Sequence, residues 1–256
     1  MTSIHQPRSL ALDLGAEEDQ ASTITRWTPT VLSRIAGAAA LLVFIGNQIY
    51  YGFVAPDLGP PEPTVHQMVT WVAAHQQQLL FQFVIGYVAI VFAALIALLV
   101  ALCRGRGMLA TLANLGAGAN LAIALTYFGL YFGVWTLSKA GGSQGGLVAV
   151  LHAAESYAHA QLMAVGLSVL AVSLLALRTR MLPGWLAWLG ILTGAEHILT
   201  YLVFAASPDY STTLGGPGGA GGIFRVLDIV LEYLWLLVTG IVLLVKPVRL
   251  PTAPSE

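Results

Sequence analysis

The stretch HAAESYAHAQLMAVGLSVLAVSLLAL, residues 152–177, decides the fold predicted for this chain. Its second part, residues 162–177, carries no charged residue, and about 20 such residues in a helix cross the hydrocarbon core of a bilayer. His152, Glu155 and His159 stand directly ahead of this apolar run. Because ionisable groups are costly in lipid, those found in a membrane segment usually face the interior of a bundle and serve a function. The stretch therefore predicts a membrane-spanning helix with a polar site near one end.

The composition of the whole chain supports a membrane protein. Hydrophobic residues make up 57% of the sequence and charged residues only 9%, whereas a soluble domain has about 25% charged residues. Most of the surface must then face lipid. The net charge of -1 provides no basic field for nucleic acid, and the single cysteine excludes an intramolecular disulfide. The expected partner is the lipid bilayer.

Six segments are long and apolar enough to cross a bilayer, which predicts an all-α, polytopic transmembrane helix bundle. The third and fourth exceed the minimal length, so we expect them to tilt or to protrude. Residues 1–30 are polar and are predicted to be a disordered tail, residues 31–245 the transmembrane domain, and residues 246–256 a second tail. The six segments are 31–54, 79–102, 108–136, 147–177, 183–206 and 222–245.

The basic residues predict the orientation of the bundle. Of the eleven lysines and arginines, all except Lys139 and Arg225 fall in the tails, at the start of the first segment or in the connectors on one side. The positive-inside rule makes that side cytoplasmic. Both termini are therefore expected in the cytoplasm. The basic residues on this side are Arg8, Arg26, Arg34, Arg104, Arg106, Arg178, Arg180, Lys246 and Arg249.

Polar side chains on the last three segments are predicted to meet inside the bilayer. With a rise of about 1.5 Å per residue, Glu155, Glu196 and Glu232 each lie roughly 12–15 Å below the outer boundary. Asn47 of the first segment reaches a similar level. We expect an outward-facing polar pocket built by these three helices, above an apolar cytoplasmic half. Its predicted lining is His152, Glu155, His159, Glu196, His197, Arg225, Asp228 and Glu232.

Carboxylates this close cannot all be ionised in a low-dielectric site without a counter-charge. Four explanations remain open. The histidines and Arg225 neutralise the acids, or a proton or cation path crosses the site, or the pocket takes a small molecule or a lipid headgroup. In the fourth, histidine and carboxylate hold a divalent metal ion such as zinc, iron or manganese, with haem held by paired histidines as a variant. The metal ligands would be Glu155, His159, His197 and Glu232.

Three functions follow from these explanations. The leading hypothesis is that the pocket binds or moves an ion or a small ligand. The second is a membrane-embedded metal-dependent hydrolase, in which Glu196 or Asp228 acts as the general base. The third is a structural membrane subunit whose buried ion pairs only fix helix register. The sequence does not decide whether the protein is an enzyme.

Two sequence features resemble a known family. They are Arg34-Ile-Ala-Gly37 at the start of the first segment and Leu182-Pro-Gly-Trp-Leu-Ala-Trp-Leu-Gly-Ile-Leu-Thr-Gly194 at the start of the fifth. Both resemble bacterial multi-pass proteins of the domain-of-unknown-function 4386 type, over residues 31–245. This resemblance implies a bundle of six or seven helices in the bacterial inner membrane. It implies no established activity and assigns no site residues.

Overall fold

The computed structural model describes residues 28–50, 70, 73–75, 83–140, 143–206 and 220–246. Within these ranges the side chains of residues 144, 151, 152, 155, 158, 159, 204, 206 and 220–226 lie outside the description. Every long element in the described part is a helix, and this part of the chain contains no strand. The helices are α2 (Pro29–Ile49), α5 (Phe83–Leu102), α6 (Met108–Lys139), α7 (Gln144–Thr179), α8 (Gly184–Ala206) and α10 (Ala220–Val245).

These six helices correspond to the six predicted segments, and each contains a stretch long and apolar enough to cross a membrane. The first begins at Pro29, so residues 29 and 30 belong to the helix and not to the predicted tail. Large apolar side chains cover the outside of the bundle, including Leu115 at 64% and Leu192 at 57% exposure. Lipid is the solvent in which such a surface is stable. The chain is therefore an integral, multi-pass membrane protein.

Local sequence explains where several helices begin and end. Pro29 occupies the start of α2, where its missing N–H costs no hydrogen bond. Ser143 caps α7, since its side chain accepts a hydrogen bond from the backbone N–H of Gly146 at 3.2 Å. At the other end of α7, Arg180 adopts a left-handed conformation with φ 53° and stops the helix.

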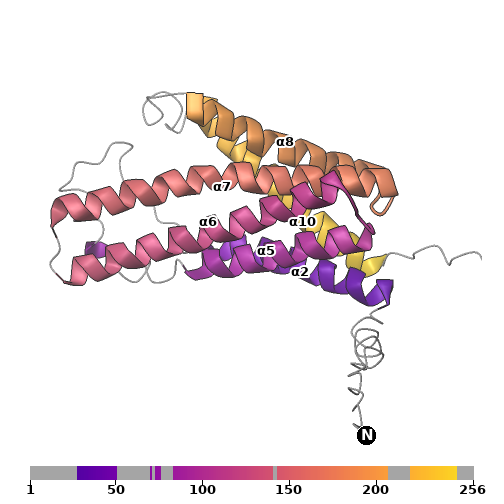
Figure 1. Ribbon diagram of the computed structural model, residues 1–256, viewed down its shortest axis with the longest axis horizontal. Helices are drawn as coiled ribbons and strands as arrows, with labels where there is room; N and C mark the ends of the chain where they lie inside the picture. The colour runs from indigo at the N-terminus through magenta and orange to yellow at the C-terminus, as the bar shows by residue number, and fades with distance from the viewer. Residues whose placement is uncertain are drawn as a thin grey trace, which may run out of the picture.

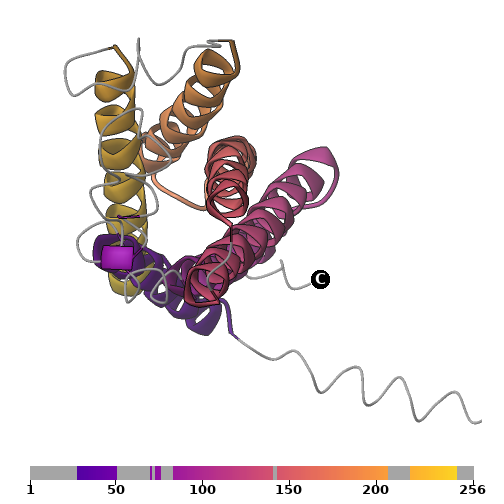
Figure 2. The same cartoon turned by 90° about the vertical axis from the view of Figure 1, so that its left-hand side faces the viewer.

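The six helices form a closed ring. Each packs against its neighbour in the order α2, α5, α6, α7, α8 and α10, and α10 returns to contact α2. Figure 1 shows the helices side by side along the long axis, and Figure 2 shows the bundle from one end. Residues from α2 and α10, at opposite ends of the sequence, are therefore neighbours. A ring of this kind encloses an interior onto which one face of every helix is directed.

The basic connectors gather at one end of the ring. Ser33 near the start of α2 donates a hydrogen bond to the backbone oxygen of Leu243 near the end of α10 at 3.1 Å. The α5–α6 connector also packs against the end of α7, where Gly105 lies against Leu175. The connectors that carry Arg104, Arg106, Arg178 and Arg180 thus lie at the same end as the first residue of α2 and the last of α10 (Figure 1).

α6 and α7 extend beyond the other helices at the opposite end (Figure 1). They have 32 and 36 residues, which at about 1.5 Å per residue exceeds the roughly 30 Å of a bilayer core. This agrees with the predicted protruding ends. A separate apolar cluster holds the extension together: it includes Tyr131, Val134 and Leu147, all almost completely buried.

Glycines allow the closest helix contacts. Gly166 of α7 and Gly194 of α8 face each other so closely that a Cβ on Gly194 would lie 2.8 Å from the backbone oxygen of Gly166. Gly116 brings α6 equally close to Ala164 of α7. Small residues at helix interfaces generally permit such backbone approach in membranes. The sequence also suggests Gly118 as a contact residue of the third helix, but Gly118 is exposed and a Cβ there would meet nothing within 4 Å.

Candidate functional site

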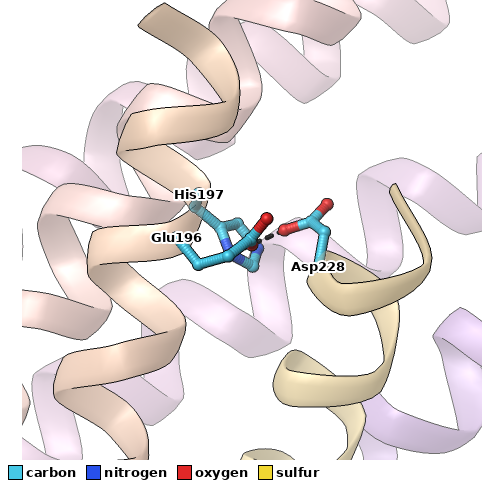
Figure 3. Close-up of side chains that lie close together, drawn as sticks. All are labelled: Glu196, His197 and Asp228. Atoms are coloured by element: carbon cyan, nitrogen blue, oxygen red, sulfur yellow. Dashed lines mark ion pairs between the residues drawn. The ribbon is translucent and has the colours of Figure 1, made fainter. Parts of the chain in front are cut away.

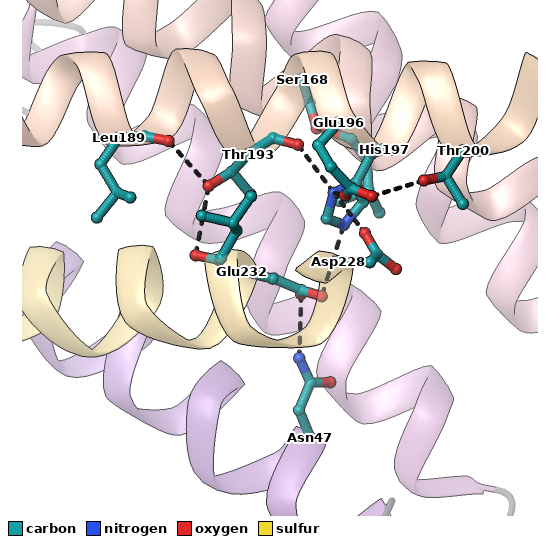
Figure 4. A network of polar contacts seen from close by, with 11 residues as sticks. Asn47, Ser168, Leu189, Thr193, Glu196, His197, Thr200, Asp228 and Glu232 are labelled. Carbon is teal, nitrogen blue, oxygen red and sulfur yellow. Dashed lines mark hydrogen bonds and ion pairs between the residues drawn. The ribbon is translucent and has the colours of Figure 1, made fainter. Parts of the chain in front are cut away.

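A buried histidine on α8 lies among three carboxylates. His197 is 1% exposed, and its Nδ1 lies 2.7 Å from Asp228 Oδ1 and 3.5 Å from Glu196 Oε2. Its other ring nitrogen, Nε2, lies 3.6 Å from Glu232 Oε2. Figure 3 shows the group on the Nδ1 side, and Figure 4 shows the wider polar network. Asp228 and Glu232 are one helical turn apart on α10, so both face α8.

The protonation of Nδ1 follows from its neighbours. The backbone oxygen of Thr193 lies 2.9 Å from Nδ1, at hydrogen-bond distance. A carbonyl oxygen only accepts hydrogen bonds, so this hydrogen bond requires the proton on Nδ1. Asp228 Oδ1 is close to Nδ1, but the N–H is directed at Thr193, and this carboxylate oxygen has no hydrogen-bond partner among the described residues. Its contact with the imidazole is therefore electrostatic.

Neutral side chains hold the other two carboxylates. Thr200 donates a hydrogen bond to Glu196 Oε1 at 2.6 Å, and Asn47 of α2 donates one to Glu232 Oε1 at 3.1 Å. The second oxygen of each glutamate, Oε2, is the one that lies near the imidazole. Of these, Glu196 Oε2 is buried without a hydrogen bond in the described part of the chain. Hydrogen bonding thus fixes the carboxylates but leaves their charge only partly compensated.

A hydroxyl on the preceding turn ties α8 to α10. Thr193 Oγ1 lies 2.9 Å from the backbone oxygen of Leu189 on its own helix and 3.3 Å from that of Leu231 on α10. It can donate to either, and both contacts are visible in Figure 4. Leu231 adjoins Glu232, so this contact sets the height of Glu232 relative to His197.

A cavity of about 140 Å³ adjoins the cluster. All six helices contribute to its wall. Asn120 of α6 is 2% exposed, and its Oδ1 has no hydrogen-bond partner among the described residues. Asn120 also belongs to the cavity wall, and an unsatisfied buried acceptor costs about 1–3 kcal/mol. The polar lining residues are Asn47, Tyr50, Asn120, Tyr127, Gln161, His197, Asp228 and Glu232.

The structure brings together four of the eight residues predicted to line the pocket, namely Glu196, His197, Asp228 and Glu232. The side chains of His152, Glu155, His159 and Arg225 lie outside the described residues. The backbone places the first three on α7 and Arg225 on α10. The predicted role of Asn47 at the same level agrees with its hydrogen bond to Glu232.

One expectation about the pocket needs correction. It was predicted from three helices, yet α2, α5 and α6 also line the cavity, because the ring closes between α2 and α10. The half beneath it, toward the basic connectors, holds the main apolar cluster, which includes Leu99, Leu175 and Leu243. The hydroxyl residues Ser33, Ser173 and Thr239 are buried in the same half. Sequence reasoning also missed Asn120 as a site residue. An asparagine inside an apolar span was the available signal, because polar groups at that depth usually face the bundle interior.

The cluster has the chemistry of a cation site. One ligand atom each from Glu196, His197 and Asp228 lie within 4.8 Å of one another. Carboxylate and imidazole are common ligands of divalent transition metals. The distances and the charge also suit a protonated amine. Comparisons with protein-family models, with curated proteins and with solved structures found no match to this chain.

Proposed function

We propose that this membrane protein binds a positively charged ion or small ligand in the cavity at the centre of its helix ring, and moves it across or within the membrane. One observation carries the proposal: among the side chains that the structure describes, one imidazole faces three carboxylates in a buried site. A fully charged imidazolium offsets only one of the three negative charges. Buried charges must be paired or neutralised, so the site attracts protons or a cation from solution.

We further infer that the cavity opens outward and that both termini are cytoplasmic, in a bacterial inner membrane. His197 lies about 20 Å along α8 from Gly184, at the end that carries the basic connectors. His197 lies only about 14 Å along the helix from Ala206, the last residue of α8. The positive-inside rule supports placing the basic end in the cytoplasm. The domain-of-unknown-function 4386 resemblance stays a prediction.

Cysteine labelling tests this orientation. Gly145→Cys, near the start of α7, should react with a membrane-impermeant maleimide on intact cells, and Met108→Cys, at the start of α6, should not. Both positions are exposed, and a Cβ at Gly145 would meet nothing within 4 Å. The native Cys103 is buried, and this burial raises the pKa of its thiol, so background labelling should be low. Labelling of Met108→Cys but not of Gly145→Cys would show that the topology is the opposite of the one proposed.

Cation binding can be measured on the purified full-length protein. The thermal unfolding temperature would be recorded in Na⁺, Mn²⁺, Zn²⁺ and methylammonium at equal ionic strength. We expect at least one cation to stabilise the protein, because a ligand at 100 times its Kd adds about 2.7 kcal/mol. Glu232→Gln should abolish the stabilisation. Gln48→Ala is the matched control, because Gln48 is exposed beside Asn47 and contacts no site residue by any described bond.

Two results would decide the proposal. Uptake of the stabilising cation into vesicles that contain the protein, lost in Glu232→Gln and kept in Gln48→Ala, would establish movement as well as binding. A wild-type protein stabilised by no cation would show that the cluster serves only to fix helix register, as buried polar groups do in some proteins.

A further inference from the structure

Resting on the proposed function, we infer that the cation is a divalent transition-metal ion, held by His197 Nε2 and Glu232 Oε2 on the cavity side of the imidazole. The remaining coordination positions would be filled by water. Such an ion is exchangeable cargo and not a permanent structural metal, because structural sites usually supply four protein ligands.

The direction of the imidazole supports this location. Nδ1 donates its proton to the backbone oxygen of Thr193 at 2.9 Å, so the lone pair of the neutral ring is on Nε2. Metal-binding histidines commonly donate a hydrogen bond to a backbone carbonyl from the ring nitrogen that does not bind the metal, since this fixes both the tautomer and the ring orientation. Asp228 Oδ1, at 2.7 Å from Nδ1, adds negative charge that makes the ring a better donor to a metal.

The second ligand is already oriented. Glu232 Oε1 accepts a hydrogen bond from Asn47 at 3.1 Å, and Oε2 is turned toward Nε2 at 3.6 Å (Figure 4). With an ion about 2.0–2.2 Å from both atoms, the N–metal–O angle would be about 110–130°, which suits tetrahedral or trigonal coordination. The separation of the two atoms therefore fits an ion held between them.

The other side of the ring is less suitable for a metal. Glu196 Oε2 and Asp228 Oδ1 both lie near Nδ1, and these three residues have the closest ligand atoms of the cluster (Figure 3). Binding there would require Nδ1 to lose its proton. Its lone pair would then face the lone pairs of the Thr193 oxygen at 2.9 Å. We therefore place Glu196 and Asp228 outside the coordination sphere.

The cavity supplies room for the rest of the coordination sphere. His197 and Glu232 both line it, and its volume of about 140 Å³ accommodates an ion with several waters. Asn47, Asn120 and Gln161 line the same cavity and give its wall the polar groups that a hydrated ion needs.

The ligand types favour transition metals over alkaline earth ions. Imidazole nitrogen suits Zn²⁺, Fe²⁺ and related ions, whereas Mg²⁺ and Ca²⁺ prefer sites made of oxygen alone. We therefore expect the purified full chain to bind Zn²⁺ or Mn²⁺ in a calorimetric titration, and Mg²⁺ at least about tenfold more weakly.

Paired variants locate the ion. Glu232→Gln should weaken Zn²⁺ binding by at least about 100-fold, since losing even an outer partner of a ligand costs 10–100-fold. Glu196→Gln removes the same charge on the other side of the ring and should reduce the affinity by less than about tenfold. An effect of Glu196→Gln equal to or larger than that of Glu232→Gln would overturn the assignment.

A measurement on the wild-type protein avoids dependence on variant folding. With ¹⁵N-labelled histidine and ¹¹³Cd²⁺ as the bound ion, metal–nitrogen coupling should split the Nε2 resonance of His197. Splitting of Nδ1 would overturn the proposal. If only Na⁺ or methylammonium binds, this inference fails and the proposed function stands. If no cation binds, both fail.

Discussion

Gly194→Ala is expected to lower the stability of the protein by about 3 kcal/mol, the upper end of the usual cost of overpacking. The added Cβ would lie 2.5 Å from the backbone nitrogen of Leu170 and 2.8 Å from the backbone oxygen of Gly166. Backbone atoms cannot rotate away as a flexible side chain can. α7 and α8 would have to separate along their whole contact. Thermal unfolding in detergent measures the loss.

Gly118→Ala is the control for this prediction. A Cβ at Gly118 would meet nothing within 4 Å, and alanine is the better helix former by up to about 1 kcal/mol. Its stability should equal or exceed that of the wild type. Equal unfolding temperatures for Gly194→Ala and the wild type would contradict the close α7–α8 contact. Since Gly194 is one turn from His197, the variant should also bind cations more weakly.

His197→Leu is expected to destabilise the protein by about 3–5 kcal/mol, the usual cost of removing one partner of a buried ion pair. Leucine fills a similar space, so the main change is electrostatic. Glu196, Asp228 and Glu232 would lose the imidazole that lies within 3.6 Å of each of them, and carboxylates in a buried site without a counter-charge must be neutralised at a cost in stability. The measurement is thermal unfolding in a chelator, so that bound ions do not mask the loss.

A double variant separates this electrostatic effect from lost packing. Asp228→Leu removes the carboxylate closest to the imidazole, so combining it with His197→Leu should cost less than the sum of the two single changes. A coupling of about 0.5–3 kcal/mol is typical of residues in contact. Strict additivity would show that His197 and Asp228 do not depend on each other. The distance of 2.7 Å between them predicts otherwise.

The six membrane helices could be predicted from sequence because hydropathy is a local property. A run such as Phe83–Leu102 is apolar over its whole length, and a bilayer leaves a helix as the main conformation for it. The level of the acidic residues could also be predicted, since a helix has a fixed rise per residue. Of the three carboxylates predicted at one level, Glu196 and Glu232 lie near the same imidazole, and the side chain of Glu155 lies outside the described residues.

Which residues of different helices contact one another could not be predicted in the same way. Rotation about a helix axis is set by contacts such as Gly166 with Gly194, where backbones touch only at positions without a side chain. Gly118 has the same local signal as Gly116 but faces away from the bundle. The hydrogen bond from Asn47 to Glu232 joins residues 185 positions apart in sequence. No local pattern contains that information.

The sequence by itself determined that this protein lies in a membrane and how many of its segments are long and apolar enough to cross it. The tertiary structure alone decided that six helices close into a ring, that Asn120 faces the same cavity as His197, and that Nε2 is the nitrogen directed at Glu232. The reason is physical: transfer into lipid depends on each segment separately, whereas a site depends on the relative rotation and height of helices, which only their mutual packing sets.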